Sequence, residues 1–217
     1  MVRVHVLVEG QTEETFVNRV LRSHFWPLGI QLCPRQLGKP GHPPGIVEYP
    51  RARGDILATL RQETNSLCTT MFDYYAMPHS WPGRKEAGGR PETIERAILD
   101  DISAEMGSGF HQARFIPYVQ MHEFEALLFS EPKSLAASLE SVEESAVQQI
   151  RDQFSSPEEI DDSQETAPSK RIERLDSSYQ KVNDGILIAQ RIGINVMRAE
   201  CPHFNEWIQR LETLAHG

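Results

Sequence analysis

Apolar residues in the first part of the chain alternate between two periods, and this alternation predicts the class of fold. Residues 2–8 are β-branched and nearly continuous in apolar character, which is typical of a strand buried in a parallel sheet. Residues 12–25 then place apolar side chains three and four positions apart, the period of a helix with one buried face. Because strand and helix patterns keep alternating to about residue 130, we expect an α/β fold with a mainly parallel central sheet flanked by helices.

The remaining elements follow from the same two periods. We expect further strands at 30–37, 68–73 and 113–120, and further helices at 55–67, 91–106, 143–154, 184–192 and 204–214. Glycine and proline predict loops at 38–45 and 76–90. The pattern is helical beyond about residue 131. We therefore divide the chain into an α/β domain, residues 1–130, and a helical extension, residues 131–217, packed on the same domain.

Composition and charge narrow the class of protein. A chain of 217 residues suits one substantial domain, and its formal net charge of −9 argues against binding nucleic acid through bulk positive charge. It does not exclude a nucleic-acid enzyme, because bound metal cations offset repulsion from phosphate. Three widely separated cysteines form no CxxC pair, and no stretch is long enough to span a membrane. We expect a cytoplasmic protein without a membrane partner.

Acidic residues follow three of the expected strands. Glu9 comes after the first strand, Asp73 ends the third, and Glu123 and Glu125 follow the fourth. Ligands of open α/β sheets bind beyond the carboxyl ends of the strands, and carboxylates there suit Mg²⁺ or Mn²⁺. In a helix Glu123 and Glu125 would diverge by roughly 200°, so we expect one of them, Glu123, to face the site unless the stretch is extended. A single acid after a strand is usually a solvated loop residue, but three at equivalent ends favour a metal site.

Five motifs, in order along the chain, resemble one family. Residues 8–13 (VEGQTE) resemble the opening motif of Toprim domains, the metal-binding module of topoisomerases, primases and overcoming-lysogenization-defect nucleases. The other four motifs are FDYYAMP at 72–78, HEFEALLF at 122–129, SKR at 169–171 and CPHFNEW at 201–207. Together they resemble a bacterial Toprim-like family of unknown function that is often encoded beside ABC-type ATPases in defence clusters.

This resemblance implies a Toprim-like fold with a metal site of known type. Glu9 would be the first-motif glutamate and Asp73 an acid of the second motif. Toprim domains typically carry Asp-x-Asp at the second motif, whereas here Tyr74 and Tyr75 follow Asp73. Glu123 or Glu125 would then have to complete the metal site.

Substrate-binding candidates flank these acids. The loop 76–90 leaves the sheet beside Asp73 and carries Trp81, Arg84 and Lys85, an aromatic ring with cations that suits a stacked base near a phosphate. Lys170 and Arg171 are the next candidates, as stabilisers of developing negative charge, with Lys170 in the catalytic set. Thr12 is expected to cap the first helix and to contribute to substrate binding.

Two other local patterns resemble catalytic motifs only in part. His122 and Glu123 begin like a zinc-protease helix, but the second histidine of that motif is replaced by Ala126. Cys201 and His203 stand close together at a helix start, where neighbouring side chains usually point apart. We expect Cys201 to be buried and His203 either to cap the helix or to pack as a polar residue.

Three functions remain open. The leading hypothesis is a nuclease for DNA or RNA that uses Mg²⁺ or Mn²⁺ held by Glu9, Asp73 and Glu123, with an ABC-type ATPase partner implied by the resemblance. The second is a non-catalytic subunit that binds such an ATPase, which the missing second aspartate and the acidic total favour. The third is a nucleotide phosphohydrolase.

Overall fold

Parallel strands form the centre of the computed structural model, which describes residues 1–38, 47–62, 65, 67–75, 77–160 and 165–216. The strands are β1 (Val2–Val8), β2 (Ile30–Gln36), β3 (Leu67–Asp73), β4 (Phe115–Ile116) and β5 (Val119–Gln120). Their order is β2-β1-β3-β4, β5 also pairs with β3, and every pairing is parallel. The predicted α/β class and mainly parallel sheet are therefore confirmed. The loop expected at 38–45 lies, apart from Gly38, outside the described residues.

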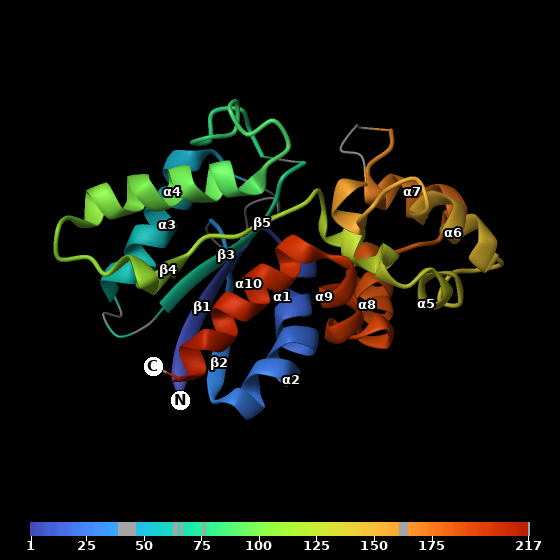
Figure 1. Cartoon of the computed structure of the whole chain (residues 1–217), viewed down its shortest axis with the longest axis horizontal. Helices are drawn as coiled ribbons and strands as arrows, with labels where there is room; N and C mark the ends of the chain where they lie inside the picture. The colour runs from blue at the N-terminus through green and yellow to red at the C-terminus, as the bar shows by residue number, and fades with distance from the viewer. Residues whose placement is uncertain (39–46, 63–64, 66, 76, 161–164, 217) are drawn as a thin grey trace.

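Helices cover both faces of this sheet (Figure 1). One face is covered by α1 (Gln11–Phe16), the π-helical turn Val17–Leu21, α2 (Arg22–Phe25) and α10 (Pro202–Glu212). The other is covered by α3 (Tyr49–Gln62) and α4 (Pro91–Met106). Alternate residues of β1 enter the two cores, Val6 on the α1 side and Leu7 on the α3 side. Burial on both faces explains why β1 is apolar almost throughout.

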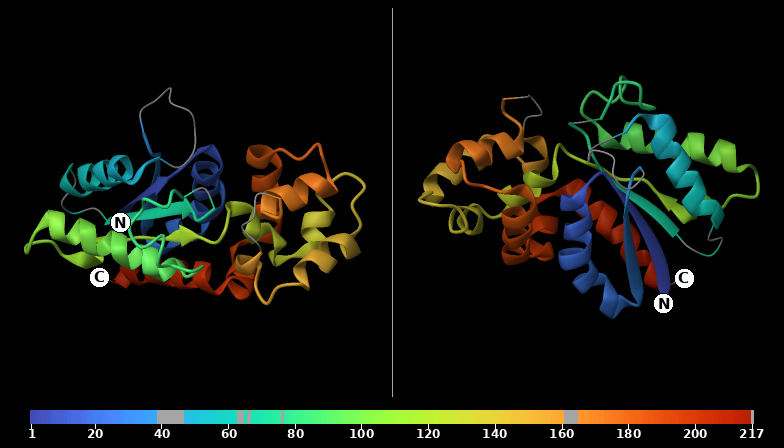
Figure 2. Two further views of the ribbon diagram at one scale, coloured as in Figure 1. Left: turned by 90° about the horizontal axis from the view of Figure 1, so that it is seen from above. Right: turned by 180° about the vertical axis from the view of Figure 1, so that it is seen from behind.

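The helices that follow β5 form a lobe beyond the carboxyl ends of the strands (Figure 2). Its elements are a 3₁₀ helix (Phe124–Ser130), α5 (Pro132–Ala136), α6 (Glu144–Arg151), α7 (Pro168–Leu175), α8 (Ile186–Ile192) and α9 (Ile194–Glu200). Leu127 and Ile188 of the lobe are fully buried in the same apolar core as Val6 of β1. The lobe and the sheet thus share one core.

The chain then returns to the sheet through α10. Trp207 stacks on Tyr118 with ring centroids 4.3 Å apart, and its Nε1 donates a hydrogen bond to Oγ1 of Thr69 on β3 at 2.8 Å. Glu158 accepts hydrogen bonds from the first free backbone N–H groups of the helix, those of His203 and Phe204. The last helix of the extension expected at 131–217 therefore belongs to the helical layer on the sheet.

Several helix and strand boundaries differ from those predicted from the sequence. The strand expected at 113–120 is broken into two short strands, because Pro117 has no N–H group for the ladder. The helix expected at 55–67 begins at Tyr49, with Pro50 in its first turn, where proline is tolerated. The helices α5, α7 and α9 were not predicted from the sequence, because they are only five to eight residues long. None of the described helices is long and apolar enough to cross a membrane.

The buried hydrogen bond of Trp207 yields a stability test. We expect Trp207→Phe to lower the free energy of unfolding by about 1–3 kcal/mol, because it removes a buried donor and replaces the stacked indole with a smaller ring. The matched control is Trp26→Phe, since Trp26 is 52% exposed and should tolerate the change with almost no effect. Urea unfolding followed by circular dichroism measures both, and equal midpoints for the two variants would contradict the role given to Trp207.

Candidate functional site

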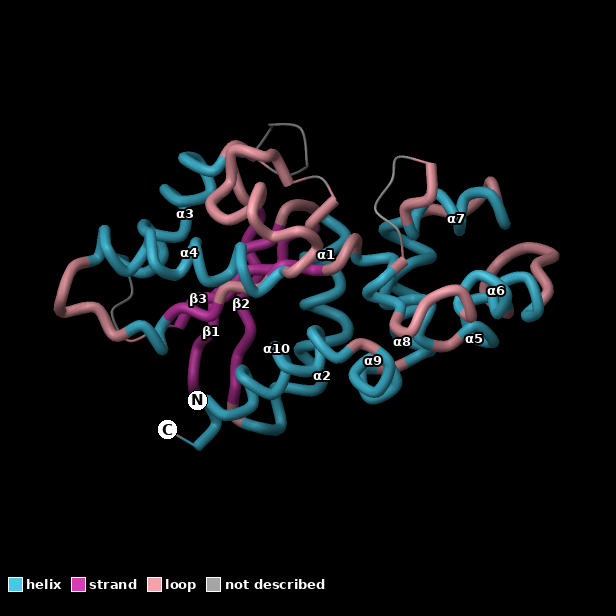
Figure 3. Tube along the Cα trace, turned by 45° about the horizontal axis from the view of Figure 1, so that its top comes forward, coloured by secondary structure: helices cyan, strands magenta, loops and turns pink. Residues whose placement is uncertain are grey.

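Two carboxylates meet where the central strands β1 and β3 end. The strands are neighbours in register, with Val8 opposite Met71, so Glu9 and Asp73 leave the same edge of the sheet. The backbone N–H of Asp73 donates a hydrogen bond to Oε1 of Glu9 at 2.7 Å. Loops that leave the carboxyl ends of the strands gather at this edge (Figure 3). The parallel topology therefore brings together the two acids that the sequence pattern selected.

A third carboxylate comes from the turn after β1. Gly10, in an extended conformation, is the N-cap of α1, and its N–H donates to Oε2 of Glu13 at 3.0 Å. Thr12, which we expected at the cap, is instead the second residue of the helix and is buried. Glu13 was not among the predicted site residues. Its position could have indicated this contact, because a glutamate three residues after the N-cap can accept a hydrogen bond from the N-cap N–H group.

Glu123 and Glu125 both reach the site, which is the outcome expected for an extended stretch; the expectation of Glu123 alone applied to a helix. Glu123 has extended backbone angles (φ −140°, ψ 162°), and the 3₁₀ helix starts just after it, so the angle between the two side chains is not that of an α-helix. The N–H of Ser169, at the start of α7, donates to Oε2 of Glu123 at 3.0 Å. Glu125 is fully buried, and both residues approach one cation, the Nζ atom of Lys181.

Lys181 is the cation of this carboxylate cluster, by which we mean Glu9, Glu13, Asp73, Glu123 and Glu125. It lies in a π-helical turn (Lys181–Gly185) that precedes α8, with Nζ 3.1 Å from Oε2 of Glu125 and 4.0 Å from Oε1 of Glu123. Burial lowers the pKa of Lys181, but the negative charges of Glu125, Glu123 and Asp73 outweigh it and raise the pKa overall. Lys181 was not among the predicted site residues, because no motif of the sequence marks it.

The electrostatics of the cluster favour an added cation. Burial, followed by repulsion between neighbouring carboxylates, raises the pKa of Glu9 and Asp73, while burial raises that of Glu125 to about 7. Among the described residues, Oδ1 of Asp73 and Oε1 of Glu125 are buried without a hydrogen-bond partner, while Oε2 of Glu125 faces Lys181. One ammonium group thus faces five carboxylates. Oxygen donors of this kind are those preferred by Mg²⁺ and Mn²⁺.

Some of these side chains would have to move to hold an ion. In the described part of the chain, no three histidine, cysteine, aspartate or glutamate side chains stand close enough together to hold one as they are. The donor set and the unpartnered oxygens fit a hard divalent cation, but the carboxylates would have to turn towards it. Lys181 lies in the space between them.

Trp81 has no exposed face for stacking with a base, which corrects the expectation for this residue. It is 2% exposed, its Nε1 donates to the carbonyl oxygen of Val47 at 3.1 Å, and its ring packs edge-on against Tyr49 and Phe72. Burying a ring of this size in the core that α3 and α4 cover stabilises the loop more than exposing it would. Trp81 therefore anchors the loop to the core.

Arg84 stays beside the strand end that carries Asp73. Its guanidinium carbon lies 3.7 Å above the ring of Tyr74, the residue after Asp73, and its Nη1 donates to the Tyr74 hydroxyl at 2.7 Å. Lys85 is exposed on the same loop. The loop thus holds one cation in a fixed position and presents a second to solvent.

Lys170 and Arg171 contact other partners. Nζ of Lys170 lies 2.6 Å from Glu173 in an exposed ion pair. The Nε of Arg171 donates to the carbonyl oxygen of Thr166, and its guanidinium lies over the ring of Phe154. The ammonium group that reaches the carboxylate cluster is that of Lys181, because the π-helical turn approaches Glu125 whereas Lys170 pairs within its own helix.

The raised carboxyl pKa values predict how stability depends on pH. The buried carboxyl groups of the folded state hold protons that the unfolded chain releases. With a chelator present to remove metal ions, the free energy of unfolding should therefore fall as the pH rises from about 4.5 towards 7. Each pKa unit of difference corresponds to about 1.4 kcal/mol. Glu125→Gln removes the titrating group and should flatten this fall, whereas Glu14→Gln, which replaces a neighbouring acid that bonds Gln36, should not. Denaturant unfolding across this range measures the slope, and an unchanged slope in Glu125→Gln would contradict the raised pKa.

Comparison with known proteins places the chain in a family. No curated protein sequence matches it. Among solved structures, the C-terminal region of the Burkholderia pseudomallei OLD protein is similar, with a TM-score of 0.53, 14% sequence identity and 99% of each chain covered. The expected relation to such proteins is thus confirmed at the level of the fold. A family model described as a domain of unknown function, DUF4276, matches residues 8–212, a span that contains the whole carboxylate cluster. The chain therefore belongs to the DUF4276 family.

Proposed function

We propose that this protein is a nuclease that hydrolyses phosphodiester bonds of DNA or RNA with the help of Mg²⁺ or Mn²⁺. The observation that carries the proposal is the carboxylate cluster, in which five acids lie around one lysine at the carboxyl edge of a parallel sheet. Burying uncompensated carboxylates costs free energy, so such a cluster is suited to a divalent cation. The fold likeness to the OLD region supports the same class of chemistry, as a Toprim-like nuclease.

Three acids suit the role of metal ligands. Backbone N–H groups of Asp73 and Ser169 hold one oxygen of Glu9 and one of Glu123, which fixes each carboxylate while its second oxygen stays available. Oδ1 of Asp73 is buried and, within the described residues, has no hydrogen-bond partner. A metal bound there would supply a Lewis acid for the phosphate and would lower the pKa of a water molecule.

Glu125 and Lys181 suit proton transfer and charge stabilisation. The pKa of Glu125, about 7, is matched to accepting a proton from water near neutral pH. Lys181 stays protonated and can stabilise the negative charge that develops on the phosphate. In this proposal Lys181 takes the role predicted for Lys170.

Arg84 is the best-placed cation for the substrate. Tyr74 holds its guanidinium directly after Asp73, so a phosphate bound at the cluster could accept hydrogen bonds from it. Lys85 would extend this contact along a nucleic-acid strand. An ABC-type ATPase that restrains the activity remains part of the proposal through the family resemblance alone.

Cleavage assays test the nuclease. We expect divalent-metal-dependent cleavage of single- or double-stranded DNA or RNA, abolished by a chelator and reduced roughly 100-fold or more by Asp73→Asn, because the metal loses a ligand. Glu14→Gln is the matched control, since this neighbouring acid bonds Gln36 and lies outside the cluster.

Calorimetric titration of Mg²⁺ and Mn²⁺ in the same samples separates the alternatives. Metal binding without cleavage of any polymer would favour the non-catalytic subunit, and phosphate release from free nucleotides alone would favour the phosphohydrolase. If millimolar metal does not bind, the proposed site is wrong.

A pair of lysine variants tests the charge assignment. We expect Lys181→Met to lower the rate of cleavage about 100-fold, the usual effect of losing one stabiliser of a developing charge. Lys170→Met should leave the rate almost unchanged, because Lys170 pairs with Glu173 at the surface. Circular dichroism with bound metal checks that both variants fold. Equal losses of rate would refute the assignment to Lys181.

A further inference from the structure

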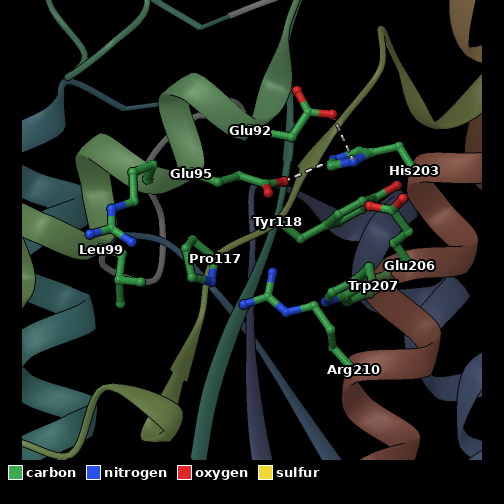
Figure 4. Close-up of a pocket in the computed structure, with 10 residues that line it drawn as sticks. Glu92, Glu95, Leu99, Pro117, Tyr118, His203, Glu206, Trp207 and Arg210 are labelled. Carbon is green, nitrogen blue, oxygen red and sulfur yellow. Dashed lines mark hydrogen bonds and ion pairs between the residues drawn. The ribbon is translucent and has the colours of Figure 1, made fainter.

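A cleft of about 300 Å³ opens between α4 and α10, outside the carboxylate cluster (Figure 4). Its acidic and aromatic lining residues are Glu92, Glu95, Tyr118, His203, Glu206 and Trp207. The rings of Tyr118 and Trp207 are buried in its floor, whereas the carboxylates of Glu92 and Glu206 stand at its exposed rim. Neither the proposed nuclease reaction nor the motifs around Glu9 and Asp73 account for this arrangement.

His203 is held in one orientation at the inner end of the cleft. Its Nε2 lies 2.9 Å from Oε1 of Glu95, and that oxygen also accepts a hydrogen bond from the backbone N–H of Val119 at 2.9 Å. The imidazole ring stacks on Tyr118 with centroids 5.1 Å apart. With Nε2–H donating to Glu95, the lone pair of Nδ1 faces away from Glu95. A histidine fixed through one nitrogen by a carboxylate is the usual arrangement of a metal ligand that binds through the other nitrogen.

The Nδ1 atom of His203 has a suitable second donor near it. Nδ1 is buried and has no hydrogen-bond partner among the described residues, and Oε1 of Glu92 lies 3.9 Å from it (Figure 4). That distance is too long for a hydrogen bond. It exceeds by about 0.5 Å the separation of about 3.4 Å between two tetrahedral ligand atoms that each lie about 2.1 Å from one ion, a difference that a small rotation of the exposed Glu92 side chain would close.

The two helices present these groups with a spacing known from metal sites. Glu92 and Glu95 are three residues apart on α4, and His203 and Glu206 are three residues apart on α10. Residues with this spacing lie on one face of a helix, and facing pairs of this kind build metal sites between helices. Glu206 is exposed and lies about one helical turn from His203. In its present rotamer it forms no metal-holding group with His203 and Glu92, so a change of rotamer would be needed to bring it to the ion as a third ligand.

The arginines of the cleft leave this end negative. Arg96 pairs with Asp100 on its own helix at 3.0 Å. Arg210 lies two helical turns beyond His203, where Figure 4 shows its guanidinium beside Pro117. The end of the cleft that contains His203 therefore carries three carboxylates.

We propose that this cleft is a second metal site, which binds a divalent transition-metal ion such as Zn²⁺ through Nδ1 of His203 and the carboxylates of Glu92 and Glu206, with Glu95 orienting the imidazole. An imidazole ligand distinguishes it from the all-oxygen carboxylate cluster, which suits Mg²⁺ or Mn²⁺. The bound ion would tie α10 to α4 across the edge of the sheet.

Calorimetric titration of the full chain with Zn²⁺, in excess Mg²⁺ to occupy the carboxylate cluster, tests this site. We expect one Zn²⁺ per chain, bound at least tenfold more weakly by Glu92→Gln and by Glu206→Gln. Glu95→Gln should weaken binding about 10- to 100-fold, because the group that orients the imidazole is altered. Glu14→Gln, which replaces an acid of α1 that bonds Gln36 and does not line the cleft, is the control and should bind Zn²⁺ like the wild type.

Nitrogen chemical shifts of the histidine rings give a direct readout that a purely structural role would not move. We expect Zn²⁺ to shift the Nδ1 resonance of His203 and to leave its Nε2 protonated. The proposal is overturned if one equivalent of Zn²⁺ leaves the ring nitrogens of His203 unchanged, or if Glu92→Gln and Glu206→Gln bind Zn²⁺ as tightly as the wild type. Both residues are exposed, so these variants test the site without disturbing the core.

Discussion

Buried negative charge at the carboxyl edge of the sheet is the constraint on which the rest of the structure depends. The hydrogen bond from the Asp73 backbone to Glu9 fixes two carboxylates between adjacent central strands. Isolated buried carboxylates are costly, so their surroundings must supply donors and cations. The helical lobe does this, since α7 provides the N–H of Ser169 and the turn before α8 provides the ammonium group of Lys181. The lobe and the sheet therefore form one site as well as one core.

The C-terminal helix, α10, crosses back over the sheet beside β4 and β5. Each of these strands is only two residues long, because Pro117 interrupts them. Short strands leave an edge with exposed backbone groups, and a side chain, Glu95, accepts the N–H of Val119 there. The same glutamate orients His203, so the residue that covers the sheet edge also prepares the nitrogen that faces the cleft.

Short-range patterns in the sequence determined the architecture. The apolar run of β1 predicted a strand buried on both faces, and the spacing of apolar residues in α1 and α4 predicted helices packed on the sheet. Topology then made Glu9 and Asp73 neighbours, because strands that run parallel end at the same edge. These two members of the cluster could be predicted from the sequence, since they depend only on strand order and direction.

Tertiary structure decided the rest of the site. Whether Glu123 and Glu125 both face the cluster depended on an extended residue before a 3₁₀ helix, which no periodicity reveals. Lys181, rather than Lys170, reaches the carboxylates. The side chain of Trp81 is buried in the core and is not available to a substrate. The positions of Lys181 and Trp81 follow from contacts between segments far apart in the chain. Sequence periodicity reports which face of an element is buried, but only the packing of the whole chain determines which distant side chain lies opposite.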